Sequence, residues 1–199
     1  MEGIILLPEG MEVDAEGSYH IVKDMSGTEL TAGLSTSGLW APHFVVDDGV
    51  TITIGAGESV TLNNAITLTV SGGASLTVAG TLINYNTIDN QGAMSVSGTM
   101  YNYGSLTNSS SFTIAISGSL TNNSSLYSDS SSGTITNSGT LANNGTLRNE
   151  NGGVIINSGT ITNNTDAILY SDGAYSGTGI VTNNGGVLSG INPIPETTP

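Results

Sequence analysis

The sequence predicts an all-β protein, a single-stranded parallel β-helix (β-solenoid) with ~20 residues and three short strands per rung and about seven rungs. A motif of the form G-T/S-L/I-x-N recurs every 18 to 21 residues, as in "SGTLANNG" (138–145). Within each repeat, β-branched residues alternate with polar ones, and Asn, Gly and Ser form the turns between apolar segments. Strands this short would bury little apolar surface in a β-sandwich. In a coil, each strand pairs in parallel with the equivalent strand of the next rung, at a spacing of ~4.8 Å.

Three columns of apolar residues define the predicted rungs, and we expect their side chains to stack inside the coil. The first column comprises Leu62, Leu82, Met100, Leu120, Leu141, Ile161 and Val181. The second column comprises Leu68, Ile88, Leu106, Leu126, Leu147, Ile168 and Leu188. The third column comprises Leu76, Met94, Ile114, Ile135, Ile155 and Tyr175. Helices are not expected in the repeats, because Gly, Asn, Ser and Thr are poor residues for a helix interior.

An asparagine follows each first-column residue by two positions, which places its side chain on the same inward face. This predicted ladder comprises Asn64, Asn84, Asn102, Asn122, Asn143, Asn163 and Asn183. A buried amide must be hydrogen-bonded, so we expect each asparagine to bond the next one in the stack and the turn backbone. Shorter ladders are expected at Asn90, Asn108, Asn149, Asn137 and Asn157. The adjacent glycines are expected to form tight corners with positive φ; they are Gly98, Gly118, Gly139 and Gly159.

The acidic residues divide the chain into parts. Ten of the sixteen acids fall before residue 59, and only five lie between residues 59 and 190. We therefore assign residues 1–48 to an irregular acidic N-terminal cap or assembly segment, and residues 49–190 to the solenoid repeats. Residues 191–199 form a Pro-rich tail, and because proline cannot donate to a sheet ladder, the repeats should stop there.

The charge balance argues against several partners. The net charge is −14, and Lys23 and Arg148 are the only lysine and arginine. Nucleic acid binding needs clustered cations, as does docking on an anionic membrane surface, so neither is expected. No apolar run reaches the ~20 residues that span a bilayer. The chain has no cysteine, which excludes disulfides and thiolate metal sites.

The sequence shows no constellation expected of an enzyme. The positions just outward of the second column are Asp89, Thr107, Tyr127 and Arg148. One acid and one arginine then lie three rungs apart, roughly 14 Å, which is too far for a catalytic pair of the kind that carbohydrate-cleaving β-helices need. We expect a protein that is not an enzyme.

No metal or cofactor site is expected either. Calcium binding between turns needs a regular Asp in every turn, and the acids here are scattered, with "VVDDG" (45–49) as the best local cluster. His20 and His43 are 23 residues apart in the irregular segment. Zinc needs three or four ligands, so structural or surface roles are expected for both histidines.

One candidate binding patch remains, formed by Tyr85, Tyr101 and Tyr103 on neighbouring rungs. Exposed aromatic rings stack on sugars or on other proteins, although stacked tyrosines at a turn are also common as structure.

An outward row of hydroxyls has one feature of an ice-binding face; its members are Thr61, Thr81, Thr99, Ser119, Thr140 and Thr160. The neighbouring row is irregular, which favours an ordinary hydroxyl ladder between strands.

Ladders such as "SGTLANNGTL" (138–147) resemble the parallel β-helix repeats of cell-surface adhesins, autotransporter passengers and archaeal surface or sheath proteins. The resemblance covers about residues 49–190 and implies an extracellular or cell-surface location. We expect a structural subunit of an extracellular fibre, sheath or cell-surface layer that self-assembles as a homopolymer through solenoid ends and terminal segments. The alternatives are a cell-surface adhesin or glycan-binding β-helix, and a phage or virus fibre segment.

The expected assembly contacts lie at the ends, because open solenoid ends are exposed sheet edges. The last rung, "NGGVLSG" (184–190), carries no charged residue to block its edge. The apolar pieces "GIILL" (3–7) and "HFVV" (43–46) could cap the same rod or add a strand to a neighbour. Trp40 is expected in the core of an N-terminal cap, and the polar tails are expected to dock on other subunits.

Overall fold

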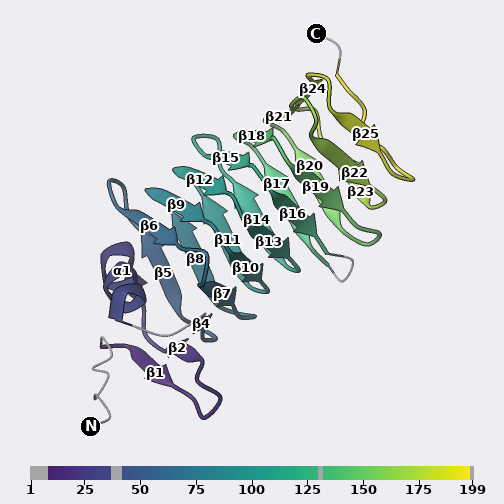
Figure 1. Ribbon diagram of the computed structural model, residues 1–199. Helices are drawn as coiled ribbons and strands as arrows, with labels where there is room; N and C mark the ends of the chain where they lie inside the picture. The colour runs from purple at the N-terminus through teal and green to yellow at the C-terminus, as the bar shows by residue number, and fades with distance from the viewer. Residues whose placement is uncertain (1–8, 37–41, 130–131, 198–199) are drawn as a thin grey trace.

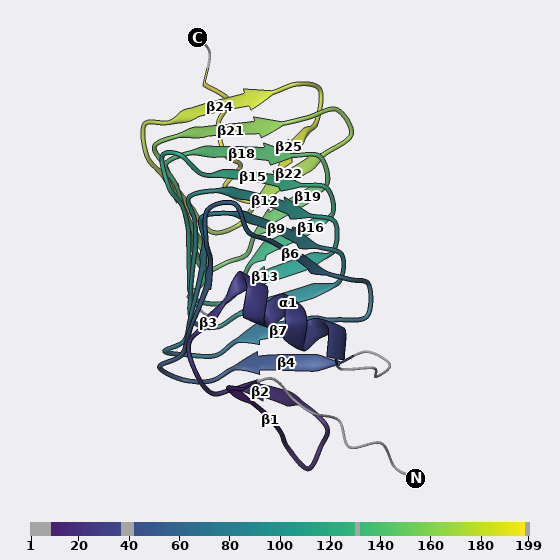
Figure 2. The same cartoon turned by 90° about the vertical axis from the view of Figure 1, so that its left-hand side faces the viewer.

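The computed structural model describes residues 9–36, 42–129 and 132–197, and over them the chain folds as a parallel β-solenoid (Figure 1). Each rung passes through three strands that belong to three sheets, which we name A, B and C. Figure 2 shows the rungs stacked as layers from the N-terminal to the C-terminal end. The predicted fold class is confirmed, with three strands per rung.

The three sheets run the length of the rod, and every described strand pair is parallel except β1 with β2. Sheet A contains, in spatial order, β1 (Met11–Val13), β2 (Tyr19–Ile21), β4 (His43–Val46), β7 (Thr67–Val70), β10 (Thr87–Asn90), β13 (Ser105–Asn108), β16 (Ser125–Ser128), β19 (Thr146–Asn149), β22 (Ile168–Ser171) and β25 (Val187–Ser189). Sheet B contains β3 (Met25–Ser26), β5 (Thr51–Ile54), β8 (Ser75–Val78), β11 (Ala93–Val96), β14 (Ser111–Ile114), β17 (Thr134–Asn137), β20 (Val154–Asn157) and β23 (Ala174–Ser176). Sheet C contains β6 (Ser59–Leu62), β9 (Thr81–Asn84), β12 (Thr99–Asn102), β15 (Ser119–Asn122), β18 (Thr140–Asn143), β21 (Thr160–Asn163) and β24 (Ile180–Asn183).

Alternation along each strand builds the core. In β15, Leu120 and Asn122 are fully buried, while Ser119 and Thr121 alternate with them and face the outer side. The same pattern repeats from rung to rung, so the inside is a stack of aliphatic side chains and asparagine amides. Each fully buried Leu, Ile or Val stabilises the fold by roughly 1.5–3 kcal/mol. The hydroxyl residues between them form the outer faces of the rod.

The first apolar column begins at a different residue from the one predicted. Val60 of β6 pairs with Leu82, and Leu62 pairs with Asn84 at the position of the asparagine ladder. The turn after β6 has four residues, 63–66, whereas the corresponding turn after β9 has two. A fixed repeat length therefore shifts the first rung by two residues, and the prediction for Leu62 was wrong.

Two further column positions are also corrected. In the second column Leu169, not Ile168, pairs with Leu147, because the turn after β21 is again four residues long. In the third column Phe112, not Ile114, pairs with Met94 and with Ile135. Both Phe112 and Ile114 are fully buried on one strand, so alternation alone cannot choose between them.

The corner glycines are required for close stacking rather than for positive φ. Gly98, Gly118, Gly139 and Gly159 do not have positive φ, which corrects the prediction. A Cβ on Gly139 would instead lie 2.2 Å from the carbonyl oxygen of Ala115 in the rung below. The turns of successive rungs therefore approach so closely that only glycine fits between them.

The acidic N-terminal segment is more regular than predicted and caps its own rod. The β1–β2 hairpin joins sheet A through parallel pairing of β2 with β4, and β4 itself pairs with β7. The segment "HFVV" (43–46) is strand β4 of this rod, so residues of the predicted N-terminal segment take part in its sheets. The predictions for "GIILL" (3–7) and Trp40 lie outside the described residues.

Helix α1 (Gly27–Thr36) covers the N-terminal end beside β5 and β6 (Figure 2). Its start is a capping box, in which the Ser26 backbone N–H donates to Glu29 and the Glu29 N–H donates to the Ser26 hydroxyl. The Glu58 carboxylate also accepts from the backbone N–H groups of Gly27 and Thr28. The Thr28 hydroxyl also hydrogen-bonds to this carboxylate. Its hydrogen bond is the largest of the contributions that lower the pKa of Glu58.

The Pro-rich tail folds back onto the last rung of its own rod, contrary to the expected docking on other subunits. The Thr197 N–H donates to the carbonyl oxygen of Val181 at 2.9 Å, and the Val181 N–H donates to the Thr197 hydroxyl at 2.7 Å. Ile194 is 1% exposed and joins the core. The tail thus covers part of the edge of β24, the strand that directly precedes the segment 184–190.

Candidate functional site

A buried asparagine ladder runs along the corner between sheets C and A. Nδ2 of each member donates to Oδ1 of the next, at 2.8 Å for the first four bonds and 3.0 Å for the last. The members in this row are Asn84, Asn102, Asn122, Asn143, Asn163 and Asn183. Each amide also donates to a backbone carbonyl near the start of a sheet A strand; Asn143, for example, donates to the oxygen of Ile168, the first residue of β22, at 2.9 Å. The predicted ladder is confirmed for these six residues.

Asn64 is the exception to the predicted ladder. Leu62 occupies the ladder position in the first rung, and Asn64 lies exposed in the longer turn that follows β6. Asn84 therefore begins the ladder, and its Oδ1 accepts from the backbone N–H of Asn86 at 3.2 Å. At its N-terminal end the ladder therefore stops at the aliphatic side chain of Leu62.

Two shorter ladders follow the other corners, as predicted. Asn90 donates to Asn108 at 2.7 Å, and Asn137 donates to Asn157 at 2.8 Å. Ser128 interrupts the first of these rows, pairing with Asn108 on one side and Asn149 on the other. The buried Oδ1 of Asn149 consequently has no hydrogen-bond partner. An unpaired buried acceptor costs roughly 1–3 kcal/mol, so this gap is a weak point of the rod.

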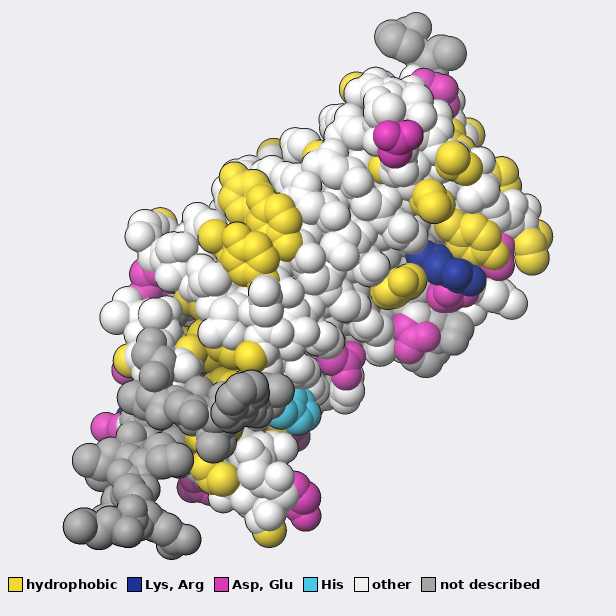
Figure 3. All heavy atoms as spheres, in the orientation of Figure 1, with side chains coloured by type: hydrophobic (Ala, Val, Ile, Leu, Met, Phe, Trp, Pro, Cys, Tyr) yellow, Lys and Arg dark blue, Asp and Glu magenta, His cyan; other side chains and the backbone are white. Residues whose placement is uncertain are grey.

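The three predicted tyrosines do come together on the outside of the rod. The rings of Tyr85 and Tyr103 stack with centroids 5.1 Å apart, and Tyr101 lies 6.4 Å from Tyr103. They are 44%, 46% and 37% exposed for Tyr85, Tyr103 and Tyr101. Figure 3 shows a compact hydrophobic patch bordered mainly by white, uncharged atoms, with other hydrophobic side chains nearer the two ends of the rod. Each ring keeps accessible surface that a ligand can contact.

A shallow hollow of about 490 Å³ adjoins this tyrosine patch on its N-terminal side. It is lined by Thr61, Asn63, Asn64, Ala65 and Tyr85. The long turn after β6 provides most of the lining, so the irregular first rung that displaces Asn64 from the ladder also shapes the hollow. An aromatic ring beside amides and a hydroxyl offers both a stacking surface and hydrogen-bonding groups.

The outer face of sheet A carries the residues considered for catalysis. Asp89, Thr107, Tyr127 and Arg148 pair in register on successive strands, as predicted. Arg148 is engaged elsewhere: it forms an ion pair with Glu150 and lies 4.6 Å from the centre of the Tyr170 ring. The arrangement stabilises this face and places no base beside Asp89.

Asp89 shares a shallow hollow of about 680 Å³ with Asp129. The two acids lie two rungs apart, roughly 10 Å along the axis by the strand spacing. Gln91 donates to Asp89 at 2.6 Å, and the Ser109 hydroxyl donates to Asp129 at 3.1 Å. Both carboxylates are therefore held by neighbours.

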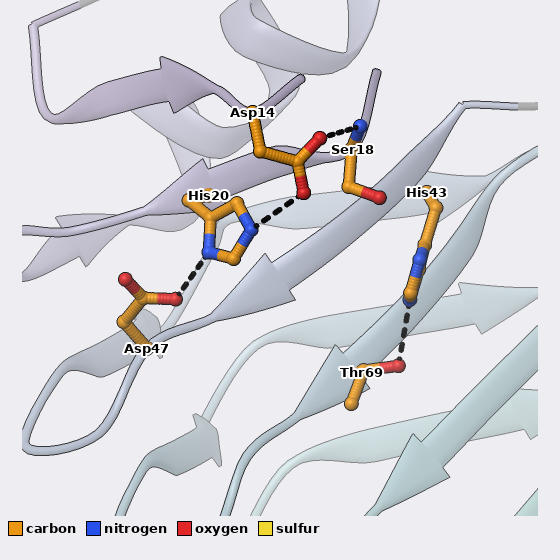
Figure 4. Close-up of polar contacts among 6 residues, drawn as sticks. All are labelled: Asp14, Ser18, His20, His43, Asp47 and Thr69. Atoms are coloured by element: carbon orange, nitrogen blue, oxygen red, sulfur yellow. Dashed lines mark hydrogen bonds and ion pairs between the residues drawn. The ribbon is translucent and has the colours of Figure 1, made fainter. Parts of the chain in front are cut away.

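His20 links the N-terminal hairpin to the first full rung (Figure 4). Its Nδ1 lies 2.7 Å from Oδ1 of Asp47, and its Nε2 lies 3.2 Å from Oδ2 of Asp14. The hydrogen bond with Asp47, followed by that with Asp14, raises the pKa of His20. The Ser18 backbone N–H holds Asp14 at 2.8 Å and lowers its pKa. The sequence showed the two acids but not that both would face one imidazole.

His43 makes a separate contact, in which its Nε2 lies 2.9 Å from the Thr69 hydroxyl (Figure 4). The structural roles expected for the two histidines fit these contacts. Within residues 9–36, 42–129 and 132–197, no group of three or more His, Asp or Glu side chains is arranged so that it could hold one metal ion, and the contacts of His20 with Asp14 and Asp47 are hydrogen bonds.

Comparison with known proteins adds no relative: no family model matches, and no curated protein or solved structure is significantly similar. In the described part of the chain no helix is long and apolar enough to cross a bilayer. The functional argument therefore depends on the geometry of this chain alone.

Proposed function

We propose that the protein is a structural rod of an extracellular or cell-surface fibre, sheath or layer, and that it associates with copies of itself. The observation that carries the proposal is the unbroken asparagine ladder from Asn84 to Asn183. These buried amides join each rung to the next. Such a stack resists bending and presents long, regular faces to its surroundings.

The exposed rows change character near the C-terminal end, which supports a contact surface there. On sheet A, hydroxyl residues up to Thr146 are followed in register by Ile168 and Val187. On sheet C, Thr160 is followed by Ile180. These three aliphatic side chains are 40%, 53% and 56% exposed, and Ile191 of the tail is 80% exposed. Exposed apolar patches of this kind mark sites of association.

The contact we propose is lateral rather than through an open C-terminal edge. The tail hydrogen-bonds to Val181, and the Asn183 N–H donates to Glu196 at 3.3 Å. Addition of another strand to this part of β24 would require displacing the tail. The outer side chains of the last rungs, by contrast, are accessible without any rearrangement.

Sedimentation of the double variant Ile168→Thr, Val187→Thr tests the contact. Each substitution restores the hydroxyl residue of the earlier rungs, so the strands should be retained while association weakens. The matched control is Ile116→Thr, which changes an 87% exposed isoleucine in the turn between β14 and β15. Equal association in the double variant and the control would contradict a contact at the last rungs.

A cell-surface adhesin is the second candidate, and the tyrosine patch favours it. Three exposed rings at one corner provide a ligand surface that a purely structural rod does not need. If the protein remains monomeric, this candidate takes the place of the first. Beads coated with wild-type protein should then adhere to cell surfaces, and Tyr85→Ala, Tyr103→Ala should abolish the adhesion.

A further inference from the structure

A row of exposed and half-buried residues follows the ladder along the outside of the same corner. Each member comes directly after the last residue of a sheet C strand. The row, which we name the corner strip, comprises Asn63, Tyr85, Tyr103, Asn123, Asn144, Asn164 and Asn184. Backbone bonds keep the corners in register; the N–H of Tyr103 donates to the Asn84 oxygen, and the N–H of Asn123 donates to the Asn102 oxygen.

The asparagines of the corner strip form a second ladder at the surface. Asn144 donates through Nδ2 to Oδ1 of Asn123 at 2.8 Å, Asn164 donates to Asn144 at 2.6 Å, and Asn184 donates to Asn164 at 3.3 Å. Each amide has two N–H donors and two acceptor lone pairs, so these bonds leave donors and acceptors for a ligand. The inter-rung bonds also fix the side chains in place, which reduces the entropy that a ligand would have to remove.

The other half of the strip is aromatic and adjoins the hollow described above. Tyr85 lines that hollow together with Asn63 and Thr61, and Tyr103 stacks on Tyr85 toward the asparagine rows. Moving along the rod, a ligand would therefore meet amides, two aromatic rings and then four more amides. Aromatic rings for stacking beside amides for hydrogen bonding are the groups that suit a sugar ring, which has an apolar face and a rim of hydroxyls.

The strip is uncharged although the protein is strongly acidic. No member of the corner strip is charged. Nor is any member of the neighbouring row on sheet C, which comprises Thr61, Ile83, Tyr101, Thr121, Ala142, Thr162 and Thr182. The net charge of −14 would repel an anionic polymer, and the strip holds no carboxylate to attract a cationic one. A neutral ligand fits these conditions.

We propose that the corner strip binds a neutral, linear polysaccharide of hexopyranose units laid along the rod axis. The rung repeat of about 4.8 Å is close to the length of one pyranose unit, so successive units can meet successive members of the strip. Tyr85 and Tyr103 supply stacking, and Asn144 and Asn164 hydrogen-bond sugar hydroxyls. This inference rests on the adhesin candidate and names the ligand class of that site.

Calorimetric titration with cello-oligosaccharides of increasing length tests the proposal. Affinity should rise with length until the strip is filled, because each added unit gains a further contact. Tyr85→Ala or Tyr103→Ala should weaken binding about tenfold, and the corresponding Phe variants should keep it, since stacking needs only the ring. Asn144→Ala or Asn164→Ala should weaken only the longer oligosaccharides, by roughly three- to tenfold.

Two controls separate this site from general effects. Tyr127→Ala removes a half-buried tyrosine from the outer face of sheet A and should leave affinity unchanged. Polygalacturonate, an anionic polymer, should not bind. The melting temperature of each variant is compared with that of the wild type, and only the small change of a surface substitution is expected. If an Ala variant proves unstable, the Phe variant at the same position still tests whether the ring is enough for binding.

The outcomes distinguish failure of the proposed ligand class from failure of the adhesin function on which it rests. Absence of cello-oligosaccharide binding, or equal affinity for all lengths, would overturn the proposed polysaccharide strip. If beads coated with wild-type protein still adhered to cells and the tyrosine variants did not, the adhesin would stand with a different ligand. If adhesion were also absent, the adhesin candidate itself would fail.

Discussion

Asn143 and Asn144 are adjacent in sequence but belong to two different ladders. Nδ2 of Asn143 donates to Asn163 inside the rod at 2.8 Å, and Nδ2 of Asn144 donates to Asn123 on the surface at 2.8 Å. The two bonds have the same length and chemistry, and they differ in burial, since Asn143 is fully buried and Asn144 is exposed. Burial therefore decides how much each one stabilises the rod.

Asn143→Ala is predicted to destabilise the protein by roughly 1–3 kcal/mol, because Nδ2 of Asn122 and Oδ1 of Asn163 lose their partner inside the core. Asn144→Ala should cost less than ~1 kcal/mol, since water replaces its partners. Urea denaturation followed by circular dichroism measures both free energies of unfolding. Equal losses of unfolding free energy in the two variants would contradict the assignment of Asn143 to the buried ladder and of Asn144 to the surface.

Ser128→Asn is predicted to stabilise the protein by about 0.5–1.5 kcal/mol. The new amide would continue the ladder between Asn108 and Asn149 and give the unpaired Oδ1 of Asn149 a donor. Thermal and urea denaturation report the gain. Ser124→Asn, a change at a half-buried turn position, serves as the control for an added amide outside the ladder. A stability no higher than that of this control would count against the gap as a weak point.

The N-terminal cap is predicted to loosen as the pH rises. Asp47 and Asp14 hold the pKa of His20 above its ordinary value, so the folded state binds the proton more tightly than the unfolded state. The added stability is fully present below the unfolded pKa of about 6.5 and is lost as the pH rises through the folded value. His20→Gln should remove this dependence. Hydrogen exchange of β1 and β2 measures the opening; pH-independent protection of wild-type β2 would refute the clamp.

Below this range a second effect has the opposite sign. The pKa of Asp14 is lowered, chiefly by the Ser18 N–H, so its contribution is present above the unfolded pKa of about 3.9 and is lost as the pH falls. Protection of the hairpin should therefore be greatest between these two limits. Asp14→Asn would retain a hydrogen-bond acceptor and flatten the acid side of the profile.

The tail is predicted to act as a lock on the C-terminal end. Ile194→Ala removes a buried side chain and should cost about 2–5 kcal/mol locally, whereas Ile191→Ala should have little effect because that residue is 80% exposed. Deleting residues 191–199 should free the backbone groups of Val181 and increase association through the exposed edge. Light scattering compares the truncated and full-length proteins. A truncated protein that associates no more than the full-length protein would refute the lock.

The sequence predicted the rungs well because the repeat itself encodes the contacts. Each inward position is apolar or Asn, and six of the seven ladder residues were placed correctly from spacing alone. The errors at Leu62 and Ile168 share one cause, a four-residue turn where most corners between sheets C and A have two. Spacing alone does not reveal a longer turn, since extra residues can project outward without disturbing the strands.

The ends of the rod were less predictable for a different reason. His20, Asp14 and Asp47 meet because β2 pairs with β4, a contact between segments that share no repeat. The docking of Ile194 and Thr197 likewise depends on the shape of the last rung. The tyrosine patch was found from rung counting, but the hollow beside it arises from the irregular turn after β6.

The association state of the purified protein tests the central claim most directly. Analytical ultracentrifugation over a wide concentration range, with electron microscopy of the same samples, shows whether rods join. A structural subunit should form oligomers or filaments that grow with concentration and that are lost in the Ile168→Thr, Val187→Thr variant. A wild-type protein that stays monomeric at high concentration, in varied salt and pH, would contradict the structural role.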